Sequence, residues 1–193
     1  MKHTLLDRVP RRDVIKGGAL GALAFLVGGK TLMLSPSEAF AQGASLRTLK
    51  AEEAETIAAM GDALVPGARA AGIVQFIDQQ ISIPPEEALL QARIMSVRPP
   101  FANLYRNIAI AIEKNVGARH GGKRFAQLGA EEATAFINDM RQNKIADWQG
   151  PPGGGFVYAV LRADSVDVFY NTVAGYAALG VPYMPHILPE KKW

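Results

Sequence analysis

Two acidic side chains one helical turn apart, Asp164 and Asp167, are the residues of this sequence best suited to acid–base chemistry. A carboxyl group buried beside a second one can hold a proton near neutral pH. Arg162 and Asp147 are also available, but no nucleophile, histidine or metal-ligand pattern accompanies the pair. We therefore expect a buried polar anchor, or a contact with another subunit, rather than a catalytic dyad.

Two glycine-rich stretches resemble nucleotide-binding loops without completing either pattern. Residues 117–123 match most of the phosphate loop G-x-x-x-x-G-K, but Arg124 follows where Ser or Thr must reach magnesium, and the loop follows a helix instead of a strand. Residues 153–155 lack the strand and helix of a dinucleotide fingerprint. We expect the basic residues nearby to form a solvated loop; they are Arg119, His120, Lys123 and Arg124.

The sequence has no cysteine and three histidines. The missing thiols exclude disulfides, thiolate metal sites, cysteine-ligated iron–sulfur clusters and C-x-x-C-H haem attachment on this chain. His186 stands between Pro185 and Ile187, which favours a packed or interface histidine over a metal ligand. We expect no catalytic residue, no bound cofactor and no metal on this chain.

The first 41 residues have the three parts of an export signal. Arg11, Arg12 and Lys16 form the basic part, residues 17–29 form a modestly apolar run, and Ala39 and Ala41 give the A-x-A pattern, which places cleavage after Ala41. The basic part resembles the twin-arginine signal R-R-x-F-L-K, with Val14 and Ile15 in place of Phe and Leu and a preceding Pro10. An uncleaved anchor is the alternative, but 13 helical residues reach roughly 20 Å, short of the ~30 Å membrane core.

The remainder, residues 42–193, is long enough for one domain, and the export signal predicts that this domain is carried to the periplasm. Six of the 21 basic and three of the 18 acidic residues lie in 1–41, which leaves 15 of each in 42–193. A formally neutral domain lacks the clustered Lys and Arg that bind phosphate backbones, so we expect no nucleic-acid partner.

Apolar residues recur at helical spacing, which predicts an all-α fold: a single compact domain of about five to six helices. Thr48 is the expected N-cap of the first helix, and 65–67 should break it. A proline pair followed by two acids predicts that another helix begins near Pro84. The other expected helices cover about 71–81, 101–117, 133–140 and, as a central buried helix, 156–179.

The C-terminal segment 180–193 carries three prolines and should be an extended arm. Its large apolar side chains must be covered, either by the chain's own helices or by a partner. Aromatic and methionine side chains are enriched at interfaces. The expected partner-binding residues are Trp148, Tyr183, Met184, His186 and Trp193.

Four segments in order resemble the gluconate 2-dehydrogenase subunit 3 family. Residues 64–78 resemble the family segment L-I/V-P-G-x-x-x-A-G-V-x-x-F-I-D, and the loop Trp148-Gln-Gly-Pro-Pro, the helix Phe156–Tyr170 and the run Gly180-Val-Pro-Tyr-Met-Pro-His-Ile follow. The likeness covers residues 47–193 and includes the twin-arginine head.

This resemblance implies a small subunit of a membrane-associated dehydrogenase complex that oxidises sugars, sugar acids or alcohols. FAD is then expected on a large subunit of the glucose–methanol–choline type, and haem c on a membrane-anchored cytochrome subunit. The family's chemistry resides on the large subunit, so no catalytic residue is carried over. The small subunit would aid export, maturation and stability of its flavoprotein partner. A free-standing periplasmic binding protein, or an enzyme with a site of unknown type, remains the alternative.

Overall fold

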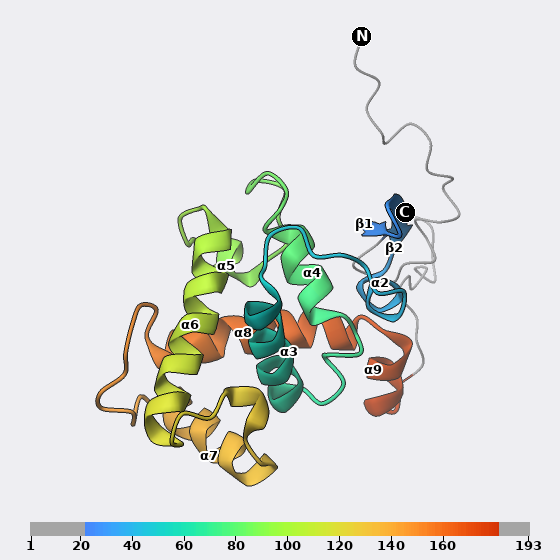
Figure 1. The fold of residues 1–193 in the computed structure, drawn as a ribbon. Helices are drawn as coiled ribbons and strands as arrows, with labels where there is room; N and C mark the ends of the chain where they lie inside the picture. The colour runs from blue at the N-terminus through green and yellow to red at the C-terminus, as the bar shows by residue number, and fades with distance from the viewer. Residues whose placement is uncertain (1–21, 182–193) are drawn as a thin grey trace, which may run out of the picture.

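The computed structural model describes residues 22–181, and within them the all-α prediction is confirmed. Eight α-helices occur in this part of the chain, four of them eight residues or shorter, together with one antiparallel hairpin (Figure 1). The elements are β1 (Leu23–Val27), β2 (Lys30–Leu34), α2 (Pro36–Ala41), α3 (Ala51–Leu64), α4 (Ile73–Gln80), α5 (Gln91–Ile94), α6 (Phe101–Arg119), η2 (Phe125–Gln127), α7 (Ala130–Arg141), α8 (Gly154–Tyr170) and α9 (Val173–Ala178).

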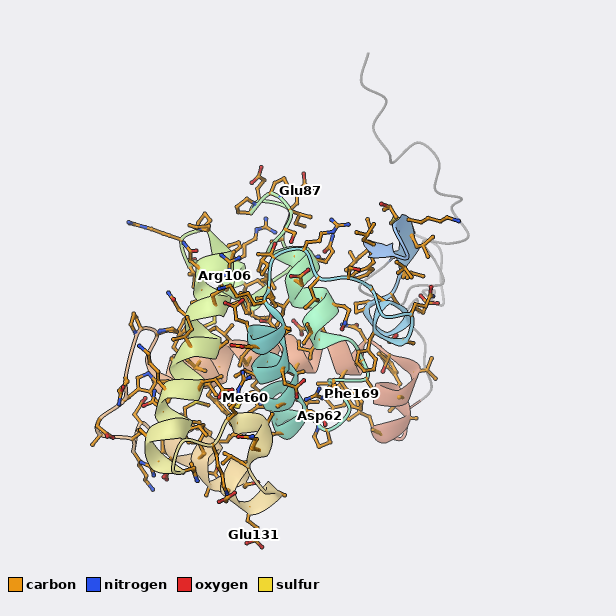
Figure 2. The ribbon with its side chains drawn as sticks, viewed as in Figure 1. Met60, Asp62, Glu87, Arg106, Glu131 and Phe169 are labelled. Carbon is orange, nitrogen blue, oxygen red and sulfur yellow. The ribbon has the colours of Figure 1, made fainter. Side chains whose placement is uncertain are left out.

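Helix α8 forms the centre of the molecule, as predicted for a helix apolar on most faces. It runs across the structure in contact with α3, α4, α5, α7 and α9 (Figure 1). Its inner side chains Val157, Val160, Leu161 and Val168 are buried with Met60 of α3. Figure 2 shows Met60 between the helices, whereas Glu87 and Glu131 point away from the body. The main core is therefore built between helices, with no sheet beneath it in the described residues.

Two predicted helix starts are wrong, and tertiary hydrogen bonds explain both. Helix α3 begins at Ala51, with Lys50 and not Thr48 in the N-cap position. The Thr48 N–H donates to the carboxylate of Asp78 at 2.9 Å, and its hydroxyl lies 2.6 Å from that of Ser82. No helix begins at Pro84; α5 covers only Gln91–Ile94. The Leu89 N–H donates to the Gln80 side chain at 2.6 Å, and this contact holds the segment in a non-helical path.

The predicted helix 156–179 is two helices, with a break at Asn171 and Thr172. The Thr172 hydroxyl accepts the Gly175 N–H at 3.0 Å, so Thr172 caps the start of α9. Side-chain to backbone bonds of this kind compete with a continuing helix. In the other direction, α6 continues through Gly117 to Arg119, two residues beyond its expected end.

The hairpin and α2 occupy residues that the sequence assigns to the export signal. Gly28 and Gly29 have positive φ angles of 54° and 79°, as a two-residue hairpin loop requires. Phe25 of β1 packs with Ala39 of α2 and with Ala44 in a small cluster separate from the main core. The sequence does not predict the two strands, because residues 23–34 show no clear two-residue alternation of apolar and polar side chains. We call residues 22–41 the leader segment.

Within residues 22–181, no helix combines the length and the apolar character needed to cross a membrane.

Gly72 offers a direct test of how the leader segment seats on the domain. Its φ is +85°, and a Cβ there would meet the carbonyl of Pro36. Gly121 has a similar φ of +62°, but open space around it. Gly121→Ala should lower the unfolding free energy of the full chain by about 1 kcal/mol through backbone strain alone. Gly72→Ala should cost at least twice as much in urea unfolding; equal losses would contradict this seating.

Candidate partner-binding face

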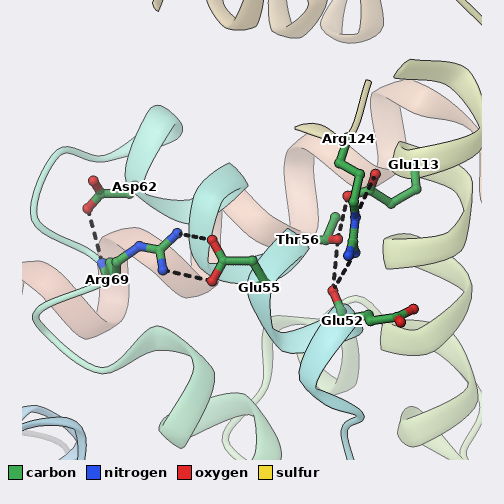
Figure 3. A network of polar contacts seen from close by, with 7 residues as sticks. All are labelled: Glu52, Glu55, Thr56, Asp62, Arg69, Glu113 and Arg124. Atoms are coloured by element: carbon green, nitrogen blue, oxygen red, sulfur yellow. Dashed lines mark hydrogen bonds and ion pairs between the residues drawn. The ribbon is translucent and has the colours of Figure 1, made fainter. Parts of the chain in front are cut away.

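Within the family-like segment 64–78, residues 65–72 form a tight turn between α3 and α4. The Asp62 carboxylate accepts the N–H groups of Gly67 at 3.0 Å and Arg69 at 3.2 Å, as Figure 3 shows for Arg69. Gly67 has a φ of +97° and lies against the ring of Phe169, so the turn packs on the end of α8. The conformation of this turn therefore depends on one carboxylate and on glycines in the left-handed region.

Arg69 lies on the outer side of this turn and pairs with Glu55 of α3. Its guanidinium donates two hydrogen bonds, of 3.0 and 2.8 Å, to the two carboxylate oxygens (Figure 3). The bond to Arg69 lowers the pKa of Glu55, although partial burial opposes this. Both side chains are more than a third exposed, so the pair contributes at most about 1 kcal/mol. Its main effect is to leave this part of the surface without net charge.

Asp78, the last residue of the family-like segment, is buried and accepts three backbone N–H groups. They come from Arg47 at 2.7 Å, Thr48 at 2.9 Å and Leu49 at 2.7 Å. A carboxylate needs several such donors when it is removed from water. Asp78 of α4 thus fixes the position of residues 47–49, which lead into α3.

The basic cluster near residue 120 is neutralised by acids. The Arg124 guanidinium lies 3.6 Å from the Glu113 carboxylate and donates to the Glu52 carbonyl at 3.1 Å (Figure 3). Glu113 also accepts the Thr56 hydroxyl. The other ion pairs are Arg119–Asp139 at 2.9 Å and Lys123–Glu132 at 3.0 Å, and the His120 Nδ1 lies 3.8 Å from Glu132. Each cation faces a carboxylate, so the geometry gives no support to phosphate binding here.

Asp164 is fully buried in α8 and acts as an anchor, one of the two roles expected for it. It accepts the Tyr105 hydroxyl of α6 at 2.5 Å and the Gln91 N–H of α5 at 3.0 Å. The Gln91 side-chain amide donates to Asp167. Burial raises the pKa of Asp164 to about 7, against the hydrogen bonds from Tyr105 and Gln91. The pair thus joins three helices through a carboxyl group that titrates near neutrality.

A shallow groove of about 320 Å³ lies between the leader segment and helices α3 and α4. Its size is at the low end of the roughly 300–1,000 Å³ of small-molecule sites. The lining is mostly apolar, and the Arg69–Glu55 pair stands at its edge; the residues are Phe40, Ala44, Leu46, Ala51, Ala54, Glu55, Ala58, Arg69, Val74 and Gln75. An apolar side chain or backbone segment suits this lining better than a polar small molecule does.

The structure gives positions for three of the predicted signal and partner-binding residues. Trp148 is partly buried, and its indole N–H donates to the carbonyls of Gly150 at 3.1 Å and Pro152 at 2.9 Å. Ala39 is buried inside α2, and Ala41 is exposed at its end. The remaining ones lie outside the described residues: Arg11, Arg12, Lys16, Tyr183, Met184, His186 and Trp193.

The sequence analysis does not predict the contacts of Asp62 and Gln91 or the three backbone N–H groups that Asp78 accepts. Asp62 and Gln91 follow no recognisable motif, so only the fold brings them to their partners. Asp78 is the last residue of the family-like segment 64–78, and this is the sequence feature that could have identified it. In residues 22–181, no cluster of three or more His, Cys, Asp and Glu side chains is arranged to hold a metal ion.

A family model described as gluconate 2-dehydrogenase subunit 3 matches residues 51–186, more than half of the chain. The chain belongs to the gluconate 2-dehydrogenase subunit 3 family. Comparisons with curated proteins and with solved structures give no match. The matched region begins at α3 and contains the turn, Asp78, the groove walls on α3 and α4, and the Asp164 anchor. The leader segment and Asp78's three backbone donors precede it.

The Asp164 anchor predicts a characteristic pH dependence of stability. Because its folded pKa is raised from 3.8 to about 7, the folded state binds the extra proton between these values. Stability is then lost as pH rises through that window, by at most about 4 kcal/mol. Asp164→Asn keeps an acceptor for Tyr105 and removes the titration, so its advantage over the wild type should grow from pH 5 to pH 8 in urea unfolding.

Asp167→Asn is the matched control for this measurement. The Asp167 charge raises the pKa of Asp164, so removing it should lower the pH at which stability falls without abolishing the dependence. Parallel pH profiles for the wild type and Asp164→Asn would show that Asp164 is already ionised throughout the range.

Proposed function

We propose that the chain is the non-catalytic small subunit of an exported, FAD-dependent dehydrogenase complex acting on sugars, sugar acids or alcohols. The family match over residues 51–186 carries this proposal. The use of polar groups in the described residues supports it. Asp62 and Asp78 hold backbone N–H groups, and Asp164 holds Tyr105, so these three carboxylates serve the architecture.

The proposed partner is a large subunit of the glucose–methanol–choline type, which would hold the FAD and perform the oxidation. A membrane-anchored cytochrome c subunit with haem c would then accept the electrons. The small subunit would supply the twin-arginine address for a partner that folds around its flavin before export. The complex would work in the periplasm, attached to the membrane through its cytochrome.

Co-purification tests this assignment. The chain, tagged and expressed with the flavoprotein encoded beside it, should co-purify with a flavin-containing polypeptide and with dehydrogenase activity measured by dye reduction. Purified alone, it should be colourless and inactive. Stoichiometric flavin, haem or metal on the isolated chain would overturn the non-catalytic role, and a flavoprotein that never associates with it would overturn the subunit role.

The C-terminal arm is the proposed anchor to the large subunit. Its prolines restrict the backbone, which reduces the entropy lost on docking. Tyr183 and Trp193 are aromatic side chains of the type that contributes about 2 kcal/mol or more at an interface centre. Deleting residues 182–193 should leave a helical domain, as circular dichroism would show, that no longer co-purifies. Undiminished co-purification of a folded truncated chain contradicts the anchor.

Export of the partner should depend on the paired arginines. Arg11→Lys together with Arg12→Lys should retain both this chain and the flavoprotein in the cytoplasm, measured by cell fractionation. Replacing Lys2 and Lys30 by Arg, which changes basic residues outside the arginine pair, is the control and should leave export intact. A flavoprotein still found in the periplasm of the double-lysine strain would remove the escort role.

A further inference from the structure

The leader segment is bound to the domain by a defined set of contacts on one face. The Ser45 N–H donates to the Leu26 carbonyl at 2.8 Å, and the Arg47 guanidinium donates to the Ala24 carbonyl at 3.0 Å. Pro36 of α2 sits over Gly72, where no side chain is present. The leader thus adds an extended strand and a short helix to the start of α4.

The surface beneath the leader has the character of an interior. Seven of the eight residues of α4 are buried, although α4 lies near the edge of the helical body (Figure 1). Helices α3 and α8 cover one side of α4, and β1 and α2 cover another. Phe40 of the leader forms one wall of the groove that Val74, Ala54 and Ala58 also line, so removal of the leader would open this apolar groove on that side.

This face does not depend on the leader for its shape. Asp78 holds the N–H groups of 47–49, so the backbone at Arg47 is fixed from the α4 side, two residues after Ser45. The main core consists of buried residues from Leu49 to Val168, and the leader's buried side chains form their own cluster with Ala44. Removal of the leader should therefore free the donors of Ser45 and Arg47 and open the groove on the side now closed by Phe40.

The family match includes the surface of α3 and α4 beside the leader segment but not the leader segment itself. The match begins at residue 51 and includes the groove walls on α3 and α4 and the turn with Gly72. The leader segment lies wholly before it. The surface thus belongs to the subunit domain, while the segment seated on it precedes that domain and ends at the predicted cleavage position, Ala41.

We propose that the leader segment occupies, in cis, a docking face for the flavoprotein subunit, and that this face becomes available when the leader is removed. The inference rests on the proposed function and adds a second surface to the C-terminal arm. The arm makes the first attachment during export, and the uncovered face completes the interface afterwards. Two linked contacts of this kind strengthen each other through effective concentration.

The contacts made by the leader define the chemistry of the occupant. It is an extended polypeptide segment whose backbone carbonyls accept from the Ser45 N–H and the Arg47 guanidinium, in the manner of a strand added to an exposed edge. It brings an apolar side chain to the groove position now held by Phe40. The segment needs no net charge at the groove, because Arg69 and Glu55 already neutralise each other.

The test uses the unprocessed full chain, produced in the cytoplasm, titrated with the purified flavoprotein subunit. Phe25 is 4% exposed in the leader's own cluster, so Phe25→Asp should release the leader without touching the main core. We expect this variant to bind at least tenfold more tightly than the wild type. Met33→Asp places the same charge at a 37% exposed position of the same hairpin and should bind like the wild type.

A second pair of substitutions shows whether the groove beside the leader is part of the surface that binds. In the Phe25→Asp chain, Gln75→Trp fills the groove and should abolish the tenfold gain. Ile110→Trp, at a 46% exposed position of α6, should preserve it. Thermal melts confirm that each variant is folded.

The outcomes separate this inference from the proposed function. Equal binding of the wild type and Phe25→Asp, or a gain that survives Gln75→Trp, overturns the docking face while the arm-mediated complex stands. If neither the wild type nor any variant binds the flavoprotein, the subunit assignment fails, and the docking face fails with it.

Discussion

The carboxylate of Asp78 accepts three consecutive backbone N–H groups, and the arrangement of α3 and α4 depends on this contact. A buried carboxylate left without donors would cost several kcal/mol, so the segment 47–49 is held firmly where the donors converge. That segment sets the start of α3, and α3 in turn packs on α8. It also positions Arg47, which with Ser45 donates to the backbone carbonyls of the leader segment. One acid thus connects the core to the surface that we assign to partner binding.

The same use of acids recurs at the other end of the structure. Asp164 lies inside α8 and holds Tyr105 of α6 and the backbone of α5. Its raised pKa reflects burial, and in an enzyme such a group would suit proton transfer. Here its oxygens are occupied by protein donors in the core. A perturbed pKa indicates a constrained environment, and the geometry decides whether the constraint serves chemistry or architecture. In this subunit it serves architecture.

The leader segment lies outside the main core, yet its apolar residues are covered. The structure provides that cover on α4 and on the 65–72 turn, where Gly72 allows the close approach of Pro36. Any surface that suits the leader also suits another chain with similar backbone acceptors and apolar groups. We propose that the leader and the partner subunit compete for this face.

The sequence by itself determined the helical class, the central helix around 156–170, the break at 65–67 and the family, because periodicity, glycines and motifs are local signals. The tertiary structure decided where α3 begins and why no helix starts at Pro84. It also decided that Asp164 is an anchor. In each case a backbone N–H or a side chain found its partner far along the chain: Leu49 at Asp78, 29 residues away, and Gln91 at Asp164, 73 residues away. Local propensity cannot report such partners, because a donor's choice between its own helix and a distant carboxylate is settled only when the elements pack.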